Sequence, residues 1–342
     1  MTDSDERRQR TSMRKVAERA DVAISSVSRV LSGHPDVSEA MRARVMAAVA
    51  ELEYEPDFLA QSLRRGQTLS VGFVLGDISN PLLAEVVQGA ETELRHNDYS
   101  LLLMCSENDP ELDVRSVRFF GARRVDGMIL SIVDERNEEL LQALRSAKVP
   151  MVLVDRSVEP DIGASSVVAN HRAGMREAVA HLIELGHRRF ALIGGSRGTL
   201  PARVREAGLA DAVEASGEAV DVEVLDGPFS PEHGAQATGR LLDMDVPPTA
   251  IVCGSNQLLV GCLSVLNART VRVGADVSLV TCDDVPASMV FHPPIASISR
   301  DMVGMGQAAA ELLVERLGDG GEPKHVVLPT RFTVRESCAP PR

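Results

Sequence analysis

The apolar residues of this chain follow two patterns, one in its first fifty residues and another after about residue 70. Between residues 12 and 33 they recur at spacings of three and four, at Val16, Ala17, Ala20, Val22, Val27, Val30 and Leu31. This spacing predicts two short helices, Met13–Ala20 and Ile24–Leu31, joined by a tight turn at Asp21. Ser38 is the expected N-cap of a third helix with an apolar stripe at Met41, Val45, Val49 and Leu52. Because each stripe is thin, we expect the three helices to close one small core.

From Val71 onward, short runs of Val, Ile and Leu alternate with helical patterns. We expect strands at 71–75, 100–104, 127–132, 150–154, 165–168, 190–194, 222–225, 249–253, 277–281, 295–299 and 325–328. Strands that are apolar on both faces and alternate with helices are typical of parallel sheets covered on both sides. We therefore predict an α/β core of two lobes, each a doubly wound parallel sheet, with lobe one at about 70–168 plus 297–328 and lobe two at about 169–296. Ligands bind beyond the carboxyl ends of such strands, so the cleft between the lobes is the candidate small-molecule site.

The net charge of −13 would by itself argue against a nucleic-acid partner. The charge is unevenly spread, however, because residues 7–44 hold nine Lys or Arg against four Asp or Glu. A local excess of this size on a small domain is enough for a surface that faces phosphates. The second predicted helix also carries Ser25, Ser26, Ser28 and Arg29 on its polar side, where short side chains can approach base edges. The alternative is a helical hairpin that serves packing alone.

Other features narrow the class of protein. The charged start MTDSDERRQR lacks the apolar region of a signal peptide, and no apolar run is long enough to span a bilayer, so we expect a cytoplasmic protein without a membrane partner. The five cysteines are scattered without a CxxC pair, which favours a reducing compartment and no structural zinc. No P-loop, GxSxG or HExxH motif is present, so we predict no cofactor, no metal and no enzymatic activity.

Motifs in collinear order along nearly the whole chain resemble those of the LacI/GalR family of bacterial transcription regulators. They include MRKVA at 13–17, VSRVLSG at 27–33, the hinge LAQSLR at 59–64, DISNP at 77–81, RVDG at 124–127, VLVDR at 152–156 and LGHRR at 185–189. The resemblance implies a small all-α helix-turn-helix headpiece at 11–56. The charged residues before it, 1–10, are expected to form a disordered tail. The resemblance also implies a hinge helix and linker at 57–69 and a dimeric core like periplasmic sugar-binding proteins at 70–342.

The resemblance assigns DNA contacts to two parts of the chain. In the headpiece these are Ser12, Arg14, Ile24, Ser25, Ser28, Arg29 and Ser38, and in the hinge they are Ala60 and Leu63. Leu63 matches the leucine that the family wedges between base steps, where unstacking is repaid by a kinked duplex with more contact surface. The alternative for Leu63 is a surface leucine on a linker.

The headpiece departs from the family pattern beside its second helix. Ala23 stands where a capping Ser is usual, and loss of a cap costs about 0.5–2 kcal/mol. Asp21 stands where Gly is usual, and Asp is one of the few residues that tolerates a left-handed backbone. Its negative charge also faces DNA phosphate, so we expect weaker operator binding than in a family-typical headpiece.

The effector site is assigned by resemblance to Leu82, Asp155, Arg205, Ser255 and Asp283. Two carboxylates and a guanidinium suit polyols, because they engage both the donors and the acceptors of hydroxyl groups. The alternative for Asp155, Arg205 and Asp283 is an ion-pair network between the lobes. Leu82 replaces a usual aromatic residue and Ser255 a usual Asn, which makes a hexose inducer doubtful. Cys253 and Cys282 lie at the ends of predicted strands that face the cleft. We expect them to be small buried apolar residues, and the alternative is a thiol sensor.

We therefore expect a sequence-specific DNA-binding repressor, a homodimer that binds a near-palindromic operator and is controlled by a sugar or polyol-like effector. One alternative keeps the DNA binding but uses a protein corepressor, another metabolite or no ligand. A plain periplasmic-type binding protein is disfavoured by residues 12–65, and an enzyme by the lack of any catalytic motif.

Overall fold

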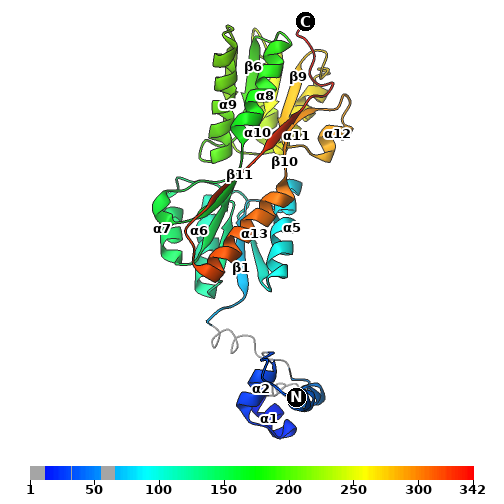
Figure 1. The fold of residues 1–342 in the computed structure, drawn as a ribbon. Coiled ribbons are helices and arrows are strands. Elements are labelled where there is room, and N and C mark those ends of the chain that lie inside the picture. Colours follow the sequence, from blue (N-terminus) through cyan, green and yellow to red (C-terminus); the bar gives the residue numbers. More distant parts are fainter. Residues whose placement is uncertain (1–11, 32, 55–65) are drawn as a thin grey trace, which may run out of the picture. The chain divides into compact units, whose positions relative to one another are not determined.

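The protein is described by a computed structural model over residues 12–31, 33–54 and 66–342 (Figure 1). The chain divides into two compact units at Thr68 and Leu69, which are treated separately below. The expected tail at 1–10 and most of the expected hinge, including Ala60 and Leu63, lie outside the described residues.

The first unit is a three-helix head formed by α1 (Met13–Ala20), α2 (Ile24–Leu31) and α3 (Glu39–Glu51). Both predicted caps are confirmed: the Ser12 hydroxyl accepts from the backbone N–H of Lys15, and the Ser38 hydroxyl accepts from that of Met41. The turn after α1 is left-handed at Asp21, with φ 50° and ψ 54°, as its residue type predicts. The helices meet in one small apolar core, formed by Val16, Ala17, Ala20, Val27, Val30, Val45, Ala48 and Tyr54.

The second unit contains two lobes, each built on one sheet. In the first lobe the strands lie in the order β11-β5-β4-β3-β1-β2, all parallel. Their bounds are β1 Ser70–Leu75, β2 Ser100–Cys105, β3 Gly127–Leu130, β4 Met151–Val154, β5 Ser165–Ala169 and β11 His325–Leu328. The helices are α5 Pro81–His96, α6 Pro110–Arg123, α7 Glu138–Ala147 and α13 Met302–Asp319, with a short 3₁₀ turn η1 at Pro160–Ile162. Helices α5 and α13 cover one face of this sheet, and α6 and α7 cover the other.

In the second lobe the strand order is β12-β10-β9-β8-β6-β7. The strands are β6 Arg189–Ile193, β7 Asp221–Leu225, β8 Ala250–Cys253, β9 Ser278–Cys282, β10 Ala296–Arg300 and β12 Thr330–Thr333. The helices are α8 His171–Glu184, α9 Leu200–Ser216, α10 Pro231–Leu242, α11 Asn256–Ala268 and α12 Pro286–Val290. Helices α8 and α9 pack on one face, and α10 and α11 on the other. The predicted two-lobed α/β fold is thereby confirmed.

Two details of the prediction are wrong. The strand at Ala296–Arg300 does not cross back to the first lobe, because β10 pairs in parallel with β9 of the second sheet. The chain therefore returns to the first lobe only with α13. Of the segment 297–328 that was predicted to belong to the first lobe, the residues in β10 belong to the second. The second sheet is also not fully parallel, since β12 pairs antiparallel with β10 along the edge. The chain thus passes between the lobes three times, after β5, after β10 and after β11 (Figure 1).

Candidate functional site

The outward side of α2 is the first candidate site. Val27 and Val30 are buried in the head core, which turns the opposite side of the helix to solvent. On that side Ser25 and Arg29 are exposed, and the Ile24 side chain is unusually accessible for its type, at 49%. An exposed apolar residue beside hydroxyl and guanidinium groups is a combination that can contact both base edges and phosphates.

The other predicted head residues are placed differently. Ser12 and Ser38 are exposed, but their hydroxyl oxygens accept the capping bonds of α1 and α3. Arg14 is exposed and lies 3.6 Å from Glu18 one turn along α1, a pair that contributes little to stability in solvent. Ser28 is half-buried. At the start of α2 the Ala23 carbonyl accepts from the backbone N–H groups of Ser26 and Val27.

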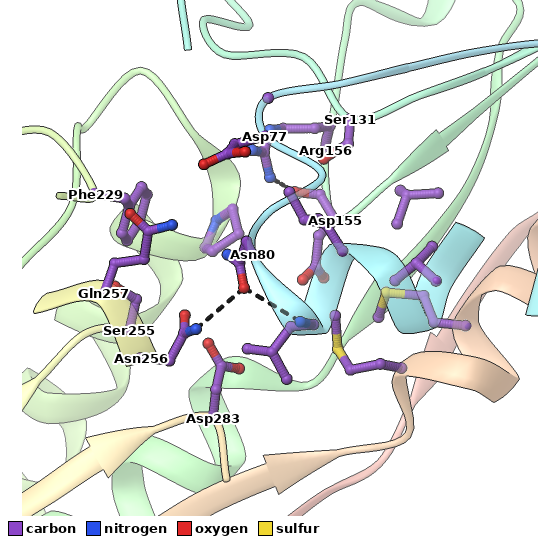
Figure 2. A pocket seen from close by; sticks show the side chains of 18 of the residues that line it. Asp77, Asn80, Ser131, Asp155, Arg156, Phe229, Ser255, Asn256, Gln257 and Asp283 are labelled. Atoms are coloured by element: carbon purple, nitrogen blue, oxygen red, sulfur yellow. Dashed lines mark hydrogen bonds between the residues drawn. The ribbon is translucent and has the colours of Figure 1, made fainter. Parts of the chain in front are cut away.

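The second candidate site is a cleft between the two lobes of the core. Asp77, Ser131 and Asp155 reach it from just beyond the ends of β1, β3 and β4, and Ser255 and Asp283 from just beyond β8 and β9. The predicted effector residues Leu82, Asp155, Arg205, Ser255 and Asp283 all line it. Figure 2 shows the carboxylates of Asp155 and Asp283 directed toward the same space from opposite lobes. Their placement follows from the parallel strand order of each sheet.

The Asp155 carboxylate in the cleft has several partners within the protein. Its Oδ1 accepts from the backbone N–H of Ala169 at 2.9 Å and lies 3.1 Å from Nε2 of His171. Burial lowers the pKa of His171 well below its usual value, and the positive charge of Arg205 acts in the same direction. His171 is therefore neutral at pH 7 and donates its Nε2 proton to Asp155.

Arg300, which the sequence does not single out, joins the two predicted carboxylates. Its Nη1 contacts Oδ2 of Asp155 in one lobe, and its Nε donates to Oδ1 of Asp283 in the other at 2.9 Å. Burial lowers the pKa of Arg300 to about 10, which leaves it protonated at neutral pH. Asp155 and Asp283 thus belong to an ion-pair network between the lobes, which was the alternative to a ligand-binding role. The cation of that network is Arg300 and not Arg205. Among the described residues Arg205 makes no such pair, and it donates from Nη1 to the Gly254 carbonyl at 2.6 Å.

Two further contacts tie the lobes together. Oδ1 of Asn80, at the start of α5, caps that helix and also accepts from Nδ2 of Asn256 in the second lobe at 3.1 Å (Figure 2). The buried carboxylate of Glu135, in the loop after β3, accepts from Nη2 of Arg203 at 2.6 Å and from the backbone N–H of Leu200 at 2.7 Å. These contacts hold the core in a closed arrangement.

Comparisons with known proteins find relatives for both units of the chain. A family model described as "Bacterial regulatory proteins, lacI family" matches residues 12–57, and one described as "Periplasmic binding protein-like domain" matches residues 179–338. The chain is 30% identical over 307 residues to the HTH-type transcriptional repressor PurR of Haemophilus influenzae (strain PittGG), with 89% of this chain and 90% of that one covered. It is 32% identical over 309 residues to the ribose operon repressor of Escherichia coli (strain K12), with 89% and 92% covered.

A solved structure of the lac repressor dimer bound to operator and the anti-inducer ONPF also matches, with a TM-score of 0.84, 27% identity, and 97% of this chain and all of that chain covered. The chain belongs to the lacI family. As a lacI-family protein it is a DNA-binding regulator of transcription, in which a helix-turn-helix head precedes an effector-binding core. None of the described helices is long and apolar enough to cross a membrane.

Three of the five cysteines of this lacI-family protein lie in the second lobe's core. Cys253, Cys262 and Cys282 are all buried. Hydrogen bonding to Cys262, together with burial, raises the pKa of Cys253 well above its usual value, and burial raises that of Cys282 to about 11. Cys253 and Cys282 are thus protonated at neutral pH, which favours the small-hydrophobe interpretation over a thiol sensor. No metal-binding group of three or more His, Cys, Asp or Glu occurs among the residues that the structure describes.

Proposed function

We propose that this protein is a transcriptional repressor that acts as a homodimer on a near-palindromic operator, with operator affinity set by a sugar or polyol-like molecule in the inter-lobe cleft. The observation that carries the proposal is the joint presence of a capped three-helix head with a polar, outward α2 and a cleft lined by polar groups from both lobes. Two heads on a two-fold dimer would contact two half-sites. Because its target is bacterial DNA, the protein would act in the cytoplasm.

In the head, Ser25 and Arg29 are the residues that we assign to sequence recognition. Both lie on the exposed side of α2, where an Arg can pair with guanine and a Ser with either a base or a phosphate. Ser12, Arg14, Ile24, Ser28 and Ser38 would support the complex through backbone contacts and packing. Ala60 and Leu63 would contact the minor groove, with Leu63 as the wedge.

The DNA-binding assignment is tested with the full chain and an operator selected from a random duplex pool. Arg29→Ala is expected to weaken specific binding at least about fivefold, because one good bidentate base contact contributes about 1–3 kcal/mol. Arg115→Ala, an exposed arginine on α6 of the core, is the matched control and should bind as the wild type does. Equal binding by the two variants would contradict the role of Arg29. Leu63→Ala should weaken specific binding much more than non-specific binding, and an equal loss of both would exclude the wedge.

The dimer contact is assigned to α5 and β2 of the first lobe. Strand β2 is the edge of its sheet, and Leu102 and Leu103 on it are exposed. An exposed apolar edge strand is a surface that proteins usually cover. Leu102→Glu is expected to shift the protein toward the monomer in sedimentation velocity. If the variant dimerises as strongly as the wild type, the dimer contact is not at β2.

A second candidate keeps the DNA binding but needs no sugar effector. It is favoured by Arg300, whose guanidinium contacts a carboxylate of each lobe and so joins the lobes through the protein's own charges. A thermal-shift screen of the full chain against sugars, polyols and nucleosides separates the two. A shift with a sugar or polyol supports effector control. The absence of any shift, with operator binding intact, supports the second candidate.

A further inference from the structure

Arg300 lies where the three chain crossings between the lobes meet. It is the last residue of β10, it stands opposite Thr330 of β12, and the next residue, Asp301, caps α13 of the first lobe. The Thr330 hydroxyl in turn donates to the carbonyl of Asn170, which caps α8 after the first crossing. The side chain of Arg300 is 11% exposed and lines the cleft. A bond made by this side chain therefore acts at the hinge of the core.

The guanidinium of Arg300 bridges two carboxylates that come from different lobes. Its Nε donates to Oδ1 of Asp283 at 2.9 Å within the second lobe, and its Nη1 contacts Oδ2 of Asp155 across the lobe boundary. Nε2 of His171, also of the second lobe, lies 3.1 Å from Oδ1 of Asp155. The carboxylate of Asp155 in the first lobe is therefore held by two side chains of the second.

Both aspartates have a left-handed backbone directly after their strands. The angle φ is 53° at Asp155 and 78° at Asp283. This conformation is unfavourable for a residue that has a side chain, and it persists where the surrounding contacts hold it. The backbone N–H groups of the two residues donate to the carbonyls of Val167 and Ile298 on neighbouring strands. These bonds fix the backbone from which each carboxylate reaches the cleft.

Without Arg300, the closed core would hold two buried carboxylates on facing sides of the boundary and lack the cation that contacts both. Asp155 and Asp283 are 5% and 4% exposed, and an ionised carboxylate buried without a counter-ion is costly. Opening of the lobes would return water to both groups. With the cation in place the charges are paired inside the protein, and contacts of hydrogen-bond length tolerate only a small movement of one lobe against the other. The bridge therefore favours closure by the chain alone.

We propose that Arg300 is an internal latch: by bridging Asp155 and Asp283 it closes the two lobes in the absence of any ligand. This inference goes beyond the second candidate above, because it states how the chain reaches the closed arrangement without an effector. A molecule that enters the cleft finds both carboxylates paired, so it must displace Arg300 from one of them or bind beside the bridge. Lobe closure is measured on the ligand-free chain, so the outcome does not depend on whether a sugar effector exists.

Hydrogen–deuterium exchange of the full, ligand-free chain measures closure at a different contact between the lobes. The backbone N–H of Leu200 donates to Glu135 of the first lobe at 2.7 Å, and the Glu135 N–H donates to the Gly198 carbonyl at 3.1 Å. Arg300→Gln should speed exchange at these two reporter amides at least about tenfold, because loss of a buried ion pair moves a two-state equilibrium by more than one factor of ten. Amides of the central strands β1 and β8 should keep their rates, which separates lobe opening from unfolding.

Arg335→Gln is the matched control. Arg335 donates from Nη1 and Nη2 to the two oxygens of Asp284, and this partly buried pair lies wholly within the second lobe. The control variant should therefore leave exchange at the two reporter amides unchanged. Equal exchange at these amides in Arg300→Gln, Arg335→Gln and the wild type overturns the latch.

Variants of Asp155 connect the effect to the bridge across the lobe boundary. Asp155→Asn removes the charge that Nη1 contacts and should also speed exchange at the reporter amides. Combined with Arg300→Gln it should add little, because the two members of one ion pair are not independent, and fully additive effects would overturn the assignment to this pair. Arg300→Lys should give an intermediate rate, because one ammonium group cannot take the positions of both Nε and Nη1. If Arg300→Gln does not fold, wild-type exchange in both Arg300→Lys and Asp155→Asn overturns the latch.

Discussion

Replacement of Glu135 by Gln should loosen the closed arrangement of the two lobes. The side chain of Glu135 is only 3% exposed, and its two oxygens have different partners. Oε1 accepts from the backbone N–H groups of Ser157 and Leu200, and Oε2 accepts from Nη2 of Arg203 at 2.6 Å. The amide oxygen of a Gln can still accept from the backbone N–H groups of Ser157 and Leu200. Its NH₂ group then faces the guanidinium of Arg203, and because both groups are donors no hydrogen bond forms between them.

The expected cost follows from these contacts. Breaking a fully buried ion pair costs about 3–5 kcal/mol. Arg203 is 31% exposed on its side chain and can regain water, so about 2 kcal/mol is a better figure here. A loss of about 2 kcal/mol changes the ratio of closed to open lobes by roughly 30-fold.

Hydrogen–deuterium exchange measures this change directly. The Leu200 N–H donates to Glu135, and the Glu135 N–H donates to the Gly198 carbonyl, so both amides are protected by lobe closure. Their exchange should accelerate roughly 30-fold in Glu135→Gln. The matched control is Glu139→Gln, because Glu139 pairs with Arg118 within the first lobe and both side chains are 58% exposed. Equal exchange at these two amides in the two variants would refute the reasoning.

Three further predictions concern the head, the core and the response to acid. Asp21→Gly should raise the stability of the head by up to about 1 kcal/mol in thermal unfolding, because glycine adopts the left-handed backbone of this position without strain. The same change should tighten operator binding, because it removes a negative charge. Gly306→Ala should destabilise the core by about 1–3 kcal/mol or more, because an added Cβ would lie 1.9 Å from a backbone oxygen of α5. The control is Gly318→Ala in the same helix, where the added Cβ meets open space and the change should be neutral or stabilising. Since the pKa of His171 is lowered on folding, the unfolded chain takes up a proton that the folded chain does not, and stability falls as the pH drops below about 6.5. His171→Gln should flatten that fall in denaturant titrations from pH 7.5 to 5, and the exposed control His292→Gln should not.

The local sequence pattern determined the head and most of the core elements. The caps at Ser12 and Ser38, the left-handed Asp21 and the bounds of α1 and α2 depend on residues within four positions of one another. Such contacts can be derived from residue type and spacing alone. The alternation of apolar strands and helices likewise specified a two-lobed α/β core, and with it the cleft at the strand ends.

Only the tertiary structure decided which strand belongs to which lobe and which charges meet. The residues of β10 would suit either sheet, so its sequence does not show which sheet it joins. Strand β12 is a short edge strand with little apolar pattern of its own. Arg300 becomes part of the cleft because β10 pairs with β9 and ends where the chain crosses between the lobes. Arg203 of the second lobe pairs with Glu135 of the first. Contacts of this kind depend on the register of residues far apart in the chain, and no local spacing encodes that register. The same contacts separate Arg205, whose guanidinium has no carboxylate within ion-pair distance among the described residues, from the arginines already paired at the lobe boundary.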